Sequence, residues 1–493
     1  MTAEIAAAED GGASRLGALA QLGLLAGPFL SMIDSSVVNV AAPSMARSFG
    51  APLSQLQWVI SGYLLALAAG LAASAWLARR YGTRQVYLAS LAGFLLLSLA
   101  CALAGSTGWL ITARVLQGLV GAPMTPLAMG MMFGREDGRK QLSPAAGLAL
   151  FLPPALGPAI GGFLVAHSGW QSIFLINLPV GLLAIAGVQR LPRSLAPGRD
   201  RTAGFDPGGL ALVSAGLALT SYGVISGPAD GWLSGRSWPL WVTGLALLGC
   251  YAVWARRRRE PAVSLRLLSA RGPALAIGLS VVAAVILFAA LFLIPAYVEQ
   301  VQGLSAAEAG LILLPQGLVM AAGTIAGDVL SRRRLVKETA VAGTLILALS
   351  TALLLLVQAA TPGWITALLL CGRGLALGLI IQPLLVATLA GLPEAELADA
   401  NTLFNIVDRI GGSFGVGLIA TFFQASVLAH LRAAGSRLGP GAPTAGPPAQ
   451  GAHGLLNAGT AAFHDTVWVL VVVAGLAVAL ALAIPRRTGC QSA

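Results

Sequence analysis

Long apolar segments separated by short polar loops recur along this whole sequence, and they limit the folds that the chain can adopt. Each segment is about 20 residues long, which is the length an α-helix needs to cross the hydrocarbon core of a bilayer. Within that core the backbone N–H and C=O groups must be bonded inside the segment, so the segments are predicted to be helices. Only 10% of the residues are charged, against about 25% in a soluble domain. We therefore expect an all-α polytopic membrane protein.

Fourteen apolar segments are counted, which predicts 14 transmembrane helices. An even number of spans places both termini on the same side of the membrane. The segments lie at about 16–40, 55–78, 86–104, 109–132, 143–166, 171–189, 207–226, 237–255, 272–296, 308–330, 338–358, 363–390, 401–424 and 464–484.

The basic residues set the expected orientation. Most of the 30 Lys and Arg residues fall in loops on one side of the predicted bundle, and such loops stay in the cytoplasm. We expect a protein of the plasma (inner) membrane with both termini cytoplasmic. The basic runs are interpreted as topology signals and lipid headgroup anchors, not as a nucleic-acid surface. The stretch Leu431–Ala461, rich in Gly, Ala and Pro, is predicted to be an irregular loop on the outer side.

Ionisable residues inside the apolar segments are the first functional candidates, because a charge there is costly unless it faces a partner or a cavity. Asp34 lies in FLSMIDSSVVNVAAP and Arg114 lies in LITARVLQGLVGAP. Gln117 and Gly118 follow Arg114 at i+3 and i+4, so they share its helix face. Two hypotheses stay open: Arg114 adjusts the proton affinity of Asp34 during a working cycle, or the two residues form a static ion pair between helices.

A second polar group is predicted in the thirteenth segment. Asn405 and Asp408 are three residues apart and share one helix face. Arg409 follows Asp408 but points about 100° away round the helix, and Arg373 of the twelfth segment is an alternative partner for Asp408. This group is either a second coupling or substrate site or a structural ion pair.

The fifth segment carries the run GPAIGG, which comprises Gly157, Pro158, Gly161 and Gly162. Gly157 and Gly161 are four residues apart, a spacing of small residues that lets two helices approach closely. Pro158 removes a backbone hydrogen bond and bends the helix. From spacing alone, tight packing and a moving hinge remain equally open.

A faint internal repeat divides the chain into halves. Gly121 and Pro126 of the fourth segment recur at the same spacing as Gly378 and Pro383 of the twelfth. We expect an N-terminal six-helix half (1–190), a cytoplasmic linker with two inserted helices (191–271) and a C-terminal six-helix half (272–493). Such repeats favour a central site reached alternately from either side of the membrane.

These motifs together resemble the major facilitator superfamily, and within it the fourteen-helix drug:proton antiporters of the EmrB/QacA type. The similar stretches are FLSMIDSSVVNVAAP, LITARVLQG, GPAIGG, IFLINLPVG, FDPGG, YVEQVQGLSAAEAGLILLP and NIVDRIGGSFGVG. The resemblance implies the major facilitator fold, with two six-helix bundles plus two extra helices, and proton-driven efflux of amphipathic compounds. It links Asp34 and Arg114 to proton coupling and the Gly-Pro run to the interface between the halves.

One stretch departs from that family. Its loop between the second and third segments reads AWLARRYGTR, so Ala75 stands where the family has Gly and Arg79 where it has an acid. Gly82 and Arg84 of the gating loop remain. In the family that acid helps to latch the closed state, and this sequence lacks it.

The expected function is a proton-coupled exporter of amphipathic small molecules such as drugs, antibiotics or natural products. Its partners are protons, the substrate and membrane lipids, and the need for an adaptor protein is open. Facilitated or proton-coupled uptake of a polar metabolite and a non-transporting scaffold or receptor are the alternatives. The sequence has no GxxxxGK[ST], HExxH or metal-binding cluster, so neither an enzyme nor a cofactor or metal is expected.

Overall fold

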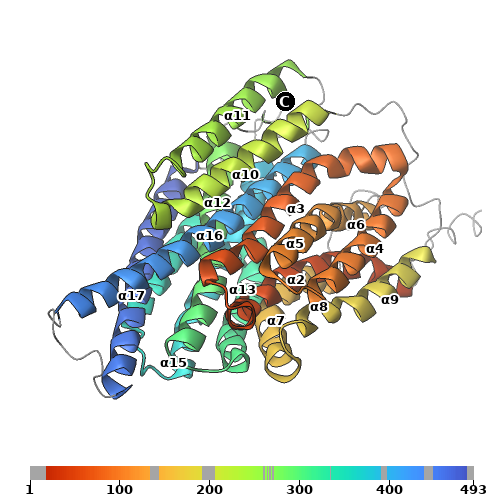
Figure 1. Ribbon diagram of the computed structural model, residues 1–493. Coiled ribbons are helices and arrows are strands. Elements are labelled where there is room, and N and C mark those ends of the chain that lie inside the picture. The colour runs from red at the N-terminus through yellow and green to blue at the C-terminus, as the bar shows by residue number, and fades with distance from the viewer. Residues whose placement is uncertain are drawn as a thin grey trace, which may run out of the picture.

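The computed structural model describes most of the chain, and its ordered elements are helices, with no strand in the described ranges. The described residues are 18–133, 144–190, 206–258, 261–263, 265, 268, 271–333, 335–389, 397–437 and 448–485. The longer helices, shown in Figure 1, are α2 (Ala18–Phe49), α3 (Leu53–Tyr81), α4 (Thr83–Ala102), α5 (Thr107–Gly121), α6 (Met124–Phe133), α7 (Pro144–Ser168), α9 (Asn177–Gln189), α10 (Pro207–Asp230), α11 (Trp238–Arg257), α12 (Arg271–Gln300), α13 (Ala306–Arg332), α14 (Val336–Leu353), α15 (Gly363–Leu389), α16 (Leu397–Arg437) and α17 (Pro448–Ala483). The one-turn helix α8 (Ser172–Leu175) precedes α9, and the 3₁₀ helix η3 (Leu354–Leu356) follows α14.

An all-α membrane architecture is confirmed, because 12 helical stretches in the described residues are long and apolar enough to cross a bilayer. The predicted span 109–132 is instead broken into α5 and α6 by a turn at Pro123. Proline lacks the N–H that would continue the helix and its ring crowds the preceding turn. The predicted span 143–166 corresponds to α7, which is 25 residues long. The count of fourteen spans fits this helix order and stays a prediction.

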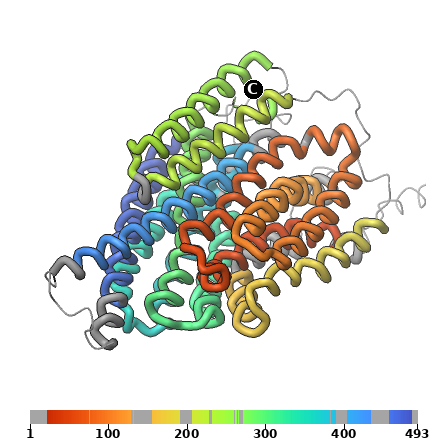
Figure 2. The backbone as a smooth tube through the Cα atoms, viewed as in Figure 1, coloured from red at the N-terminus to blue at the C-terminus, as the bar shows by residue number. Residues whose placement is uncertain are grey.

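The predicted irregular loop at Leu431–Ala461 is wrong over much of its length. Helix α16 continues to Arg437 and α17 starts at Pro448, so only 438–447 lie outside the described residues. The 41 residues of α16 span about 60 Å at 1.5 Å per residue, twice the hydrocarbon thickness of about 30 Å. The two helices lie at the left of Figure 2 and pack on each other. Asp465 joins them by accepting hydrogen bonds from Ser426 (2.5 Å) and His430 (2.8 Å).

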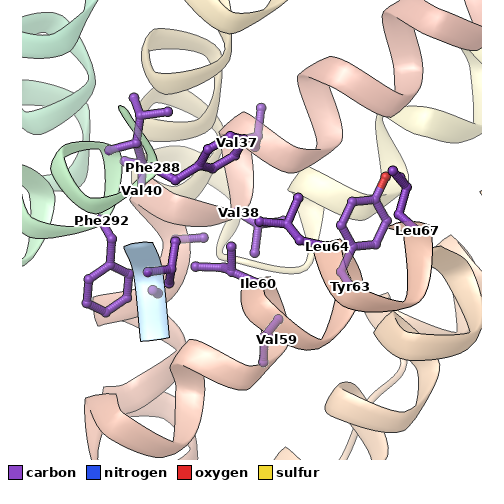
Figure 3. Close-up of a cluster of buried hydrophobic side chains, with 14 of the residues drawn as sticks. Val37, Val38, Val40, Val59, Ile60, Tyr63, Leu64, Leu67, Phe288 and Phe292 are labelled. Carbon is purple, nitrogen blue, oxygen red and sulfur yellow. The ribbon is translucent and has the colours of Figure 1, made fainter. Parts of the chain in front are cut away.

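The helices before residue 190 and those after residue 271 form two groups that meet along three helix pairs. Helix α3 packs on α16, α7 on α13, and α2 on α12. A continuous apolar core crosses this boundary. Figure 3 shows Val37 and Val40 of α2 beside Phe288 of α12, with Val59, Ile60 and Leu64 of α3 close by.

Helices α10 and α11 form a separate hairpin at the upper left of Figure 1. They pack on each other, and α10 also packs on α16 and α3. Asp206 fastens the start of this hairpin, because its carboxylate accepts hydrogen bonds from the Gly209 amide (2.9 Å), the Trp254 indole (3.0 Å) and the Ala262 amide (3.3 Å). The hairpin therefore lies beside the two groups and leaves their shared boundary intact.

Candidate functional site

Asp34 lies in the middle of α2 and is 1% exposed. Its Oδ2 accepts a hydrogen bond from Arg114 Nη1 of α5 at 2.6 Å, and its Oδ1 accepts one from Asn177 Nδ2 of α9 at 3.1 Å. A buried carboxylate is stable only where its oxygens have such partners. The expected pairing of Asp34 with Arg114 is thus present in the structure, inside the N-terminal group of helices.

Arg114 is fully buried and is held by groups of α2, α3 and its own helix α5. Its Nε donates to the Val59 carbonyl of α3 at 3.1 Å, and Nη1 donates to both Asp34 and Gln117 Oε1, the latter at 2.7 Å. The guanidinium carbon lies 4.0 Å from the centre of the Tyr63 ring, a distance at which the ring face attracts a cation. Nη2 is buried without a hydrogen-bond partner in the described part of the chain. The cation is therefore positioned but incompletely satisfied.

Gln117 and Gly118 lie on the same face of α5 as Arg114, as their spacing predicts. Gln117 Oε1 accepts from Arg114, and its Nε2 donates to the Phe94 carbonyl of α4 at 3.5 Å. Gly118 faces the backbone of Tyr63 on α3, where a Cβ would collide with the carbonyl oxygen. The glycine lets α3 and α5 approach closely enough for Arg114 to reach the α3 backbone.

Asn177 is a site residue that sequence analysis did not single out. Its Nδ2 lies 3.1 Å from Asp34 and 2.9 Å from Ser98 Oγ of α4, which in turn donates to the Phe174 carbonyl at 2.9 Å. The only signal in the sequence was a polar residue within the apolar run IFLINLPVG. That run resembles a family signature, but the sequence does not show which helix the side chain of Asn177 faces.

A cavity of about 290 Å³ lies at the boundary between the two groups of helices. Asp34 does not line it, but its neighbours Ser35 and Ser36 do, so α2 presents the acid to one side and the cavity to the other. The charged residues among the described lining, Asp408 and Arg409, come from α16 on the opposite wall. The described lining residues are Met32, Ser35, Ser36, Thr125, Ser280, Ala283, Ala284, Leu287, Phe288, Leu291, Met320, Leu377, Ile381, Leu384, Leu385, Phe404, Asn405, Asp408 and Arg409.

Arg373 does not line this cavity and forms no ion pair with Asp408, so the alternative pairing of these two residues is not present in the structure. Its Nη1 donates to Thr351 Oγ1 of α14 at 2.7 Å and its Nη2 to the Ile286 carbonyl of α12 at 3.0 Å. The residue is fully buried and its Nε has no partner in the described residues. The residues predicted to group around Asp408 therefore lie in two places. Asn405, Asp408 and Arg409 line the cavity. Arg373 of α15 instead bonds to α14 and α12.

The glycines of GPAIGG separate two neighbouring helices. Gly157 and Gly161 lie against Ser36 and Val37 of α2, so a Cβ at either position would be crowded. Gly162 lies against the backbone of α13 at Ala306. In return, Gly310 of α13 faces the Pro158 carbonyl. The motif therefore lies where α2, α7 and α13 meet, at the boundary between the two groups.

Gly82 and Arg84 of the predicted gating loop make contacts inside the N-terminal group. Gly82 adopts a φ of +95°, which favours glycine, at the turn between α3 and α4. Arg84 donates to the carbonyls of Val188 (3.3 Å) and Gln189 (2.7 Å) at the end of α9. These bonds satisfy carbonyls that have no partner within their own helix and tie α4 to α9.

Polar contacts close the boundary at one end of the bundle, which we call the 49–53 end because α2 stops and α3 starts there. Ser61 and Ser413 exchange hydrogen bonds with each other's backbone carbonyl at 3.2 and 3.1 Å. Arg47 of α2 pairs with Glu299 of α12 at 3.2 Å. Further contacts join Gln57 to Thr421 and the Ser54 amide to Gln424. Along α2, α12 and α16, the residues that line the cavity precede these contacts and lie farther from the 49–53 end.

Among the described residues, no three His, Cys, Asp or Glu side chains are grouped so as to hold a metal ion. The site consists instead of one buried ion pair within the N-terminal group and one cavity between the groups.

Comparison with known proteins identifies related chains. The family model described as Major Facilitator Superfamily matches residues 24–416. A multidrug resistance protein B homolog of Mycobacterium tuberculosis is 36% identical over 403 residues, 79% of this chain and 73% of that protein. A tetracenomycin C resistance and export protein of Streptomyces glaucescens is 32% identical, covering 82% of this chain and 76% of that protein.

Solved structures share the fold. A bacterial homolog of the human lysosomal transporter Spinster, crystallised in an inward-facing and unoccupied conformation, has a TM-score of 0.65 at 15% identity, with 98% of this chain and 100% of that chain covered. A D-xylose–proton symporter has a TM-score of 0.65 at 14% identity, with 97% and 100% covered. At these identities the likeness concerns the fold alone.

Proposed function

Since this chain belongs to the Major Facilitator Superfamily, we propose that it is a proton-coupled exporter of amphipathic small molecules such as drugs or antibiotics. The observation that carries the proposal is the buried Asp34–Arg114 pair on a helix whose opposite side lines the cavity. Relatives named for multidrug resistance and for tetracenomycin C resistance and export support this direction of transport. Protons and a small molecule are the expected partners.

Asp34 carries the exchanged proton in this proposal. An ionised Asp34 holds Arg114 through the 2.6 Å bond, and protonation removes the charge that makes this bond strong. A buried pair that loses one charge is destabilised, because the remaining charge stays away from water. Protonation of Asp34 therefore weakens the contacts that hold α2 against α5 and α9, and α2 shifts relative to them.

Helix α2 couples the proton to the substrate. A shift of α2 moves Met32, Ser35 and Ser36 in the cavity wall, because they lie on the same rigid helix as Asp34. The same shift slides α2 over Gly157 and Gly161 of α7, where no Cβ obstructs it. Since α7 also packs on α13 through Gly162, the motion is passed to the C-terminal helices. The proton site and the substrate site are separate places on one moving element.

The proposed topology places the 49–53 end at the outer face of the plasma membrane and both termini in the cytoplasm. Residues 1–190 and 272–493 act as the two rocking halves, and 191–271 supply a linker and the α10–α11 hairpin. The closed 49–53 end then corresponds to a conformation that faces the cytoplasm, which is where an exporter collects its substrate.

Efflux from cells tests the proposal. A panel of cationic, neutral and anionic lipophiles is loaded into cells that express the wild type, Asp34→Asn or the matched control Asp465→Asn. Asp465 is an acid on α17 whose side chain is 45% exposed, outside the buried pair. We expect the wild type and the control to export at least one compound in a manner abolished by an uncoupler, and Asp34→Asn to lose that export. Uncoupler-sensitive export by Asp34→Asn at the wild-type rate would remove Asp34 from coupling.

A further inference from the structure

The cavity wall carries two opposite charges side by side. Among the described lining residues, Asp408 and Arg409 of α16 are the charged ones. Arg409 is 8% exposed, and its Nε is buried without a hydrogen-bond partner in the described part of the chain. Asp408 is partly buried. A buried cation with an unsatisfied donor is costly, so Arg409 is poised for a group that can accept hydrogen bonds.

The two charges interact electrostatically but form no ion pair with each other. Consecutive residues point about 100° apart on a helix, and no ion pair within 4 Å joins Asp408 or Arg409 to any described side chain. Arg373, the other candidate cation, is engaged with Thr351 and the Ile286 carbonyl and lies off the cavity. The cavity therefore contains one negative and one positive charge from adjacent residues, and neither forms an ion pair with a described side chain.

Most of the remaining wall is apolar, and its uncharged polar residues are Ser35, Ser36, Thr125, Ser280 and Asn405. Leu287, Phe288 and Leu291 of α12 face the same space as Phe404 and Leu384. Ligand sites of this kind enclose an apolar body and fix its orientation with a few polar groups. A molecule with an apolar body and a polar end that bears both charges would place its body against the apolar residues and its charges beside Asp408 and Arg409.

We propose that the cavity binds a zwitterionic amphipath, whose anionic group pairs with Arg409 and whose protonated amine pairs with Asp408. The assignment rests on the proposed transport function and names its substrate class. A ligand with a positive charge alone is repelled by Arg409, and a ligand with a negative charge alone is repelled by Asp408. Each also leaves one buried charge of the wall unpaired.

A matched set of four probes tests the assignment on the purified full-length protein in detergent. The probes share one naphthalene body: 2-naphthylalanine (zwitterion), its methyl ester (cation), N-acetyl-2-naphthylalanine (anion) and the N-acetyl methyl ester (neutral). Binding is measured by equilibrium dialysis with naphthalene fluorescence. We expect the wild type to bind the zwitterion about tenfold more tightly than either singly charged probe, the factor that about 1.4 kcal/mol supplies.

Two variants should reverse the preference in opposite directions. Asp408→Asn leaves Arg409 alone and should favour the anion, whereas Arg409→Gln leaves Asp408 and should favour the cation. Arg432→Gln removes a cation from an exposed position of the same helix and should change nothing. A wild type that prefers the methyl ester, a preference unmoved by either variant, or no binding of any of the four probes would overturn the assignment.

The efflux experiment tests the proposed function independently of the probe experiment, which tests the substrate class. Efflux of the lipophile panel that is sensitive to an uncoupler and to Asp34→Asn would stand even if the probe set showed no zwitterion preference, and then only the substrate class would be wrong. Loss of probe preference together with absence of any uncoupler-sensitive efflux would contradict both.

Discussion

Each group of helices buries one arginine completely, and the two arginines are satisfied differently. Arg114 of α5 bonds a carboxylate, an amide and a backbone carbonyl. Arg373 of α15 bonds a hydroxyl and a backbone carbonyl, with no acid among its partners in the described residues. The N-terminal pair can gain or lose a charge through Asp34, whereas the C-terminal cation stays fixed. The comparison supports the proposal that proton exchange occurs in the N-terminal group and that Arg373 has a structural role.

Removing the charged partner of Asp34 gives the largest expected effect. Arg114→Gln leaves the carboxylate buried without its cation, which should lower the free energy of unfolding by about 3–5 kcal/mol and abolish uncoupler-sensitive efflux. Unfolding in detergent and efflux from cells measure the two effects. The double variant Asp34→Asn/Arg114→Gln removes both charges, so it should regain most of the stability but not the efflux. A single variant as stable as the wild type would show that Asp34 does not depend on Arg114.

Substitution at the second arginine should cost less and leave coupling intact. Arg373→Gln loses hydrogen bonds to Thr351 and the Ile286 carbonyl but strands no acid, so we expect a loss of about 1–2 kcal/mol. Uncoupler-sensitive efflux should persist at a measurable rate, with the exposed Arg432→Gln as the control for loss of a basic residue. A loss of stability and coupling equal to that of Arg114→Gln would break the proposed difference between the two groups.

The Arg47–Glu299 pair joins the two groups at the 49–53 end and should have the smallest effect on stability. The side chain of Arg47 is 62% exposed and that of Glu299 is 1% exposed, so water screens the arginine end and we expect loss of the pair to cost about 1 kcal/mol. Glu299→Gln should instead loosen the closed end and increase labelling of Ser413→Cys by a membrane-impermeant maleimide, by up to about fivefold for 1 kcal/mol, in a background without native cysteines.

Two further variants serve as controls for this labelling experiment. Arg47→Gln should increase labelling as Glu299→Gln does, since either change removes the pair. Glu308→Gln alters only the cap of α13, where Glu308 bonds Ser305, and should leave labelling unchanged. Unaltered labelling in both pair variants would show that this contact does not hold the end closed.

Several features of the fold and the site could be predicted from residue order. Apolar segments of about 20 residues must become helices in a bilayer because no water is present to bond the backbone. The cost of a charge in that setting singled out Asp34 and Arg114, and the i, i+3, i+4 spacing placed Gln117 and Gly118 on the face of Arg114. The end of an apolar run was a weaker guide, because Ala-rich sequence continues a helix beyond the membrane. The predicted loop at Leu431–Ala461 was wrong for that reason.

What the sequence by itself determined is the class of the chain: a helical membrane protein, with an acid and an arginine placed where only partners or a cavity make them tolerable. Tertiary structure alone decided which partners those are. It brought Asn177 to Asp34 across 143 residues, kept Arg373 from Asp408, and turned Ser35 and Ser36 toward the cavity while Asp34 faces away. The physical reason is that local spacing fixes only the relative directions of side chains on one helix. The rotation of each helix, and the helix it meets, come from how all of them pack together.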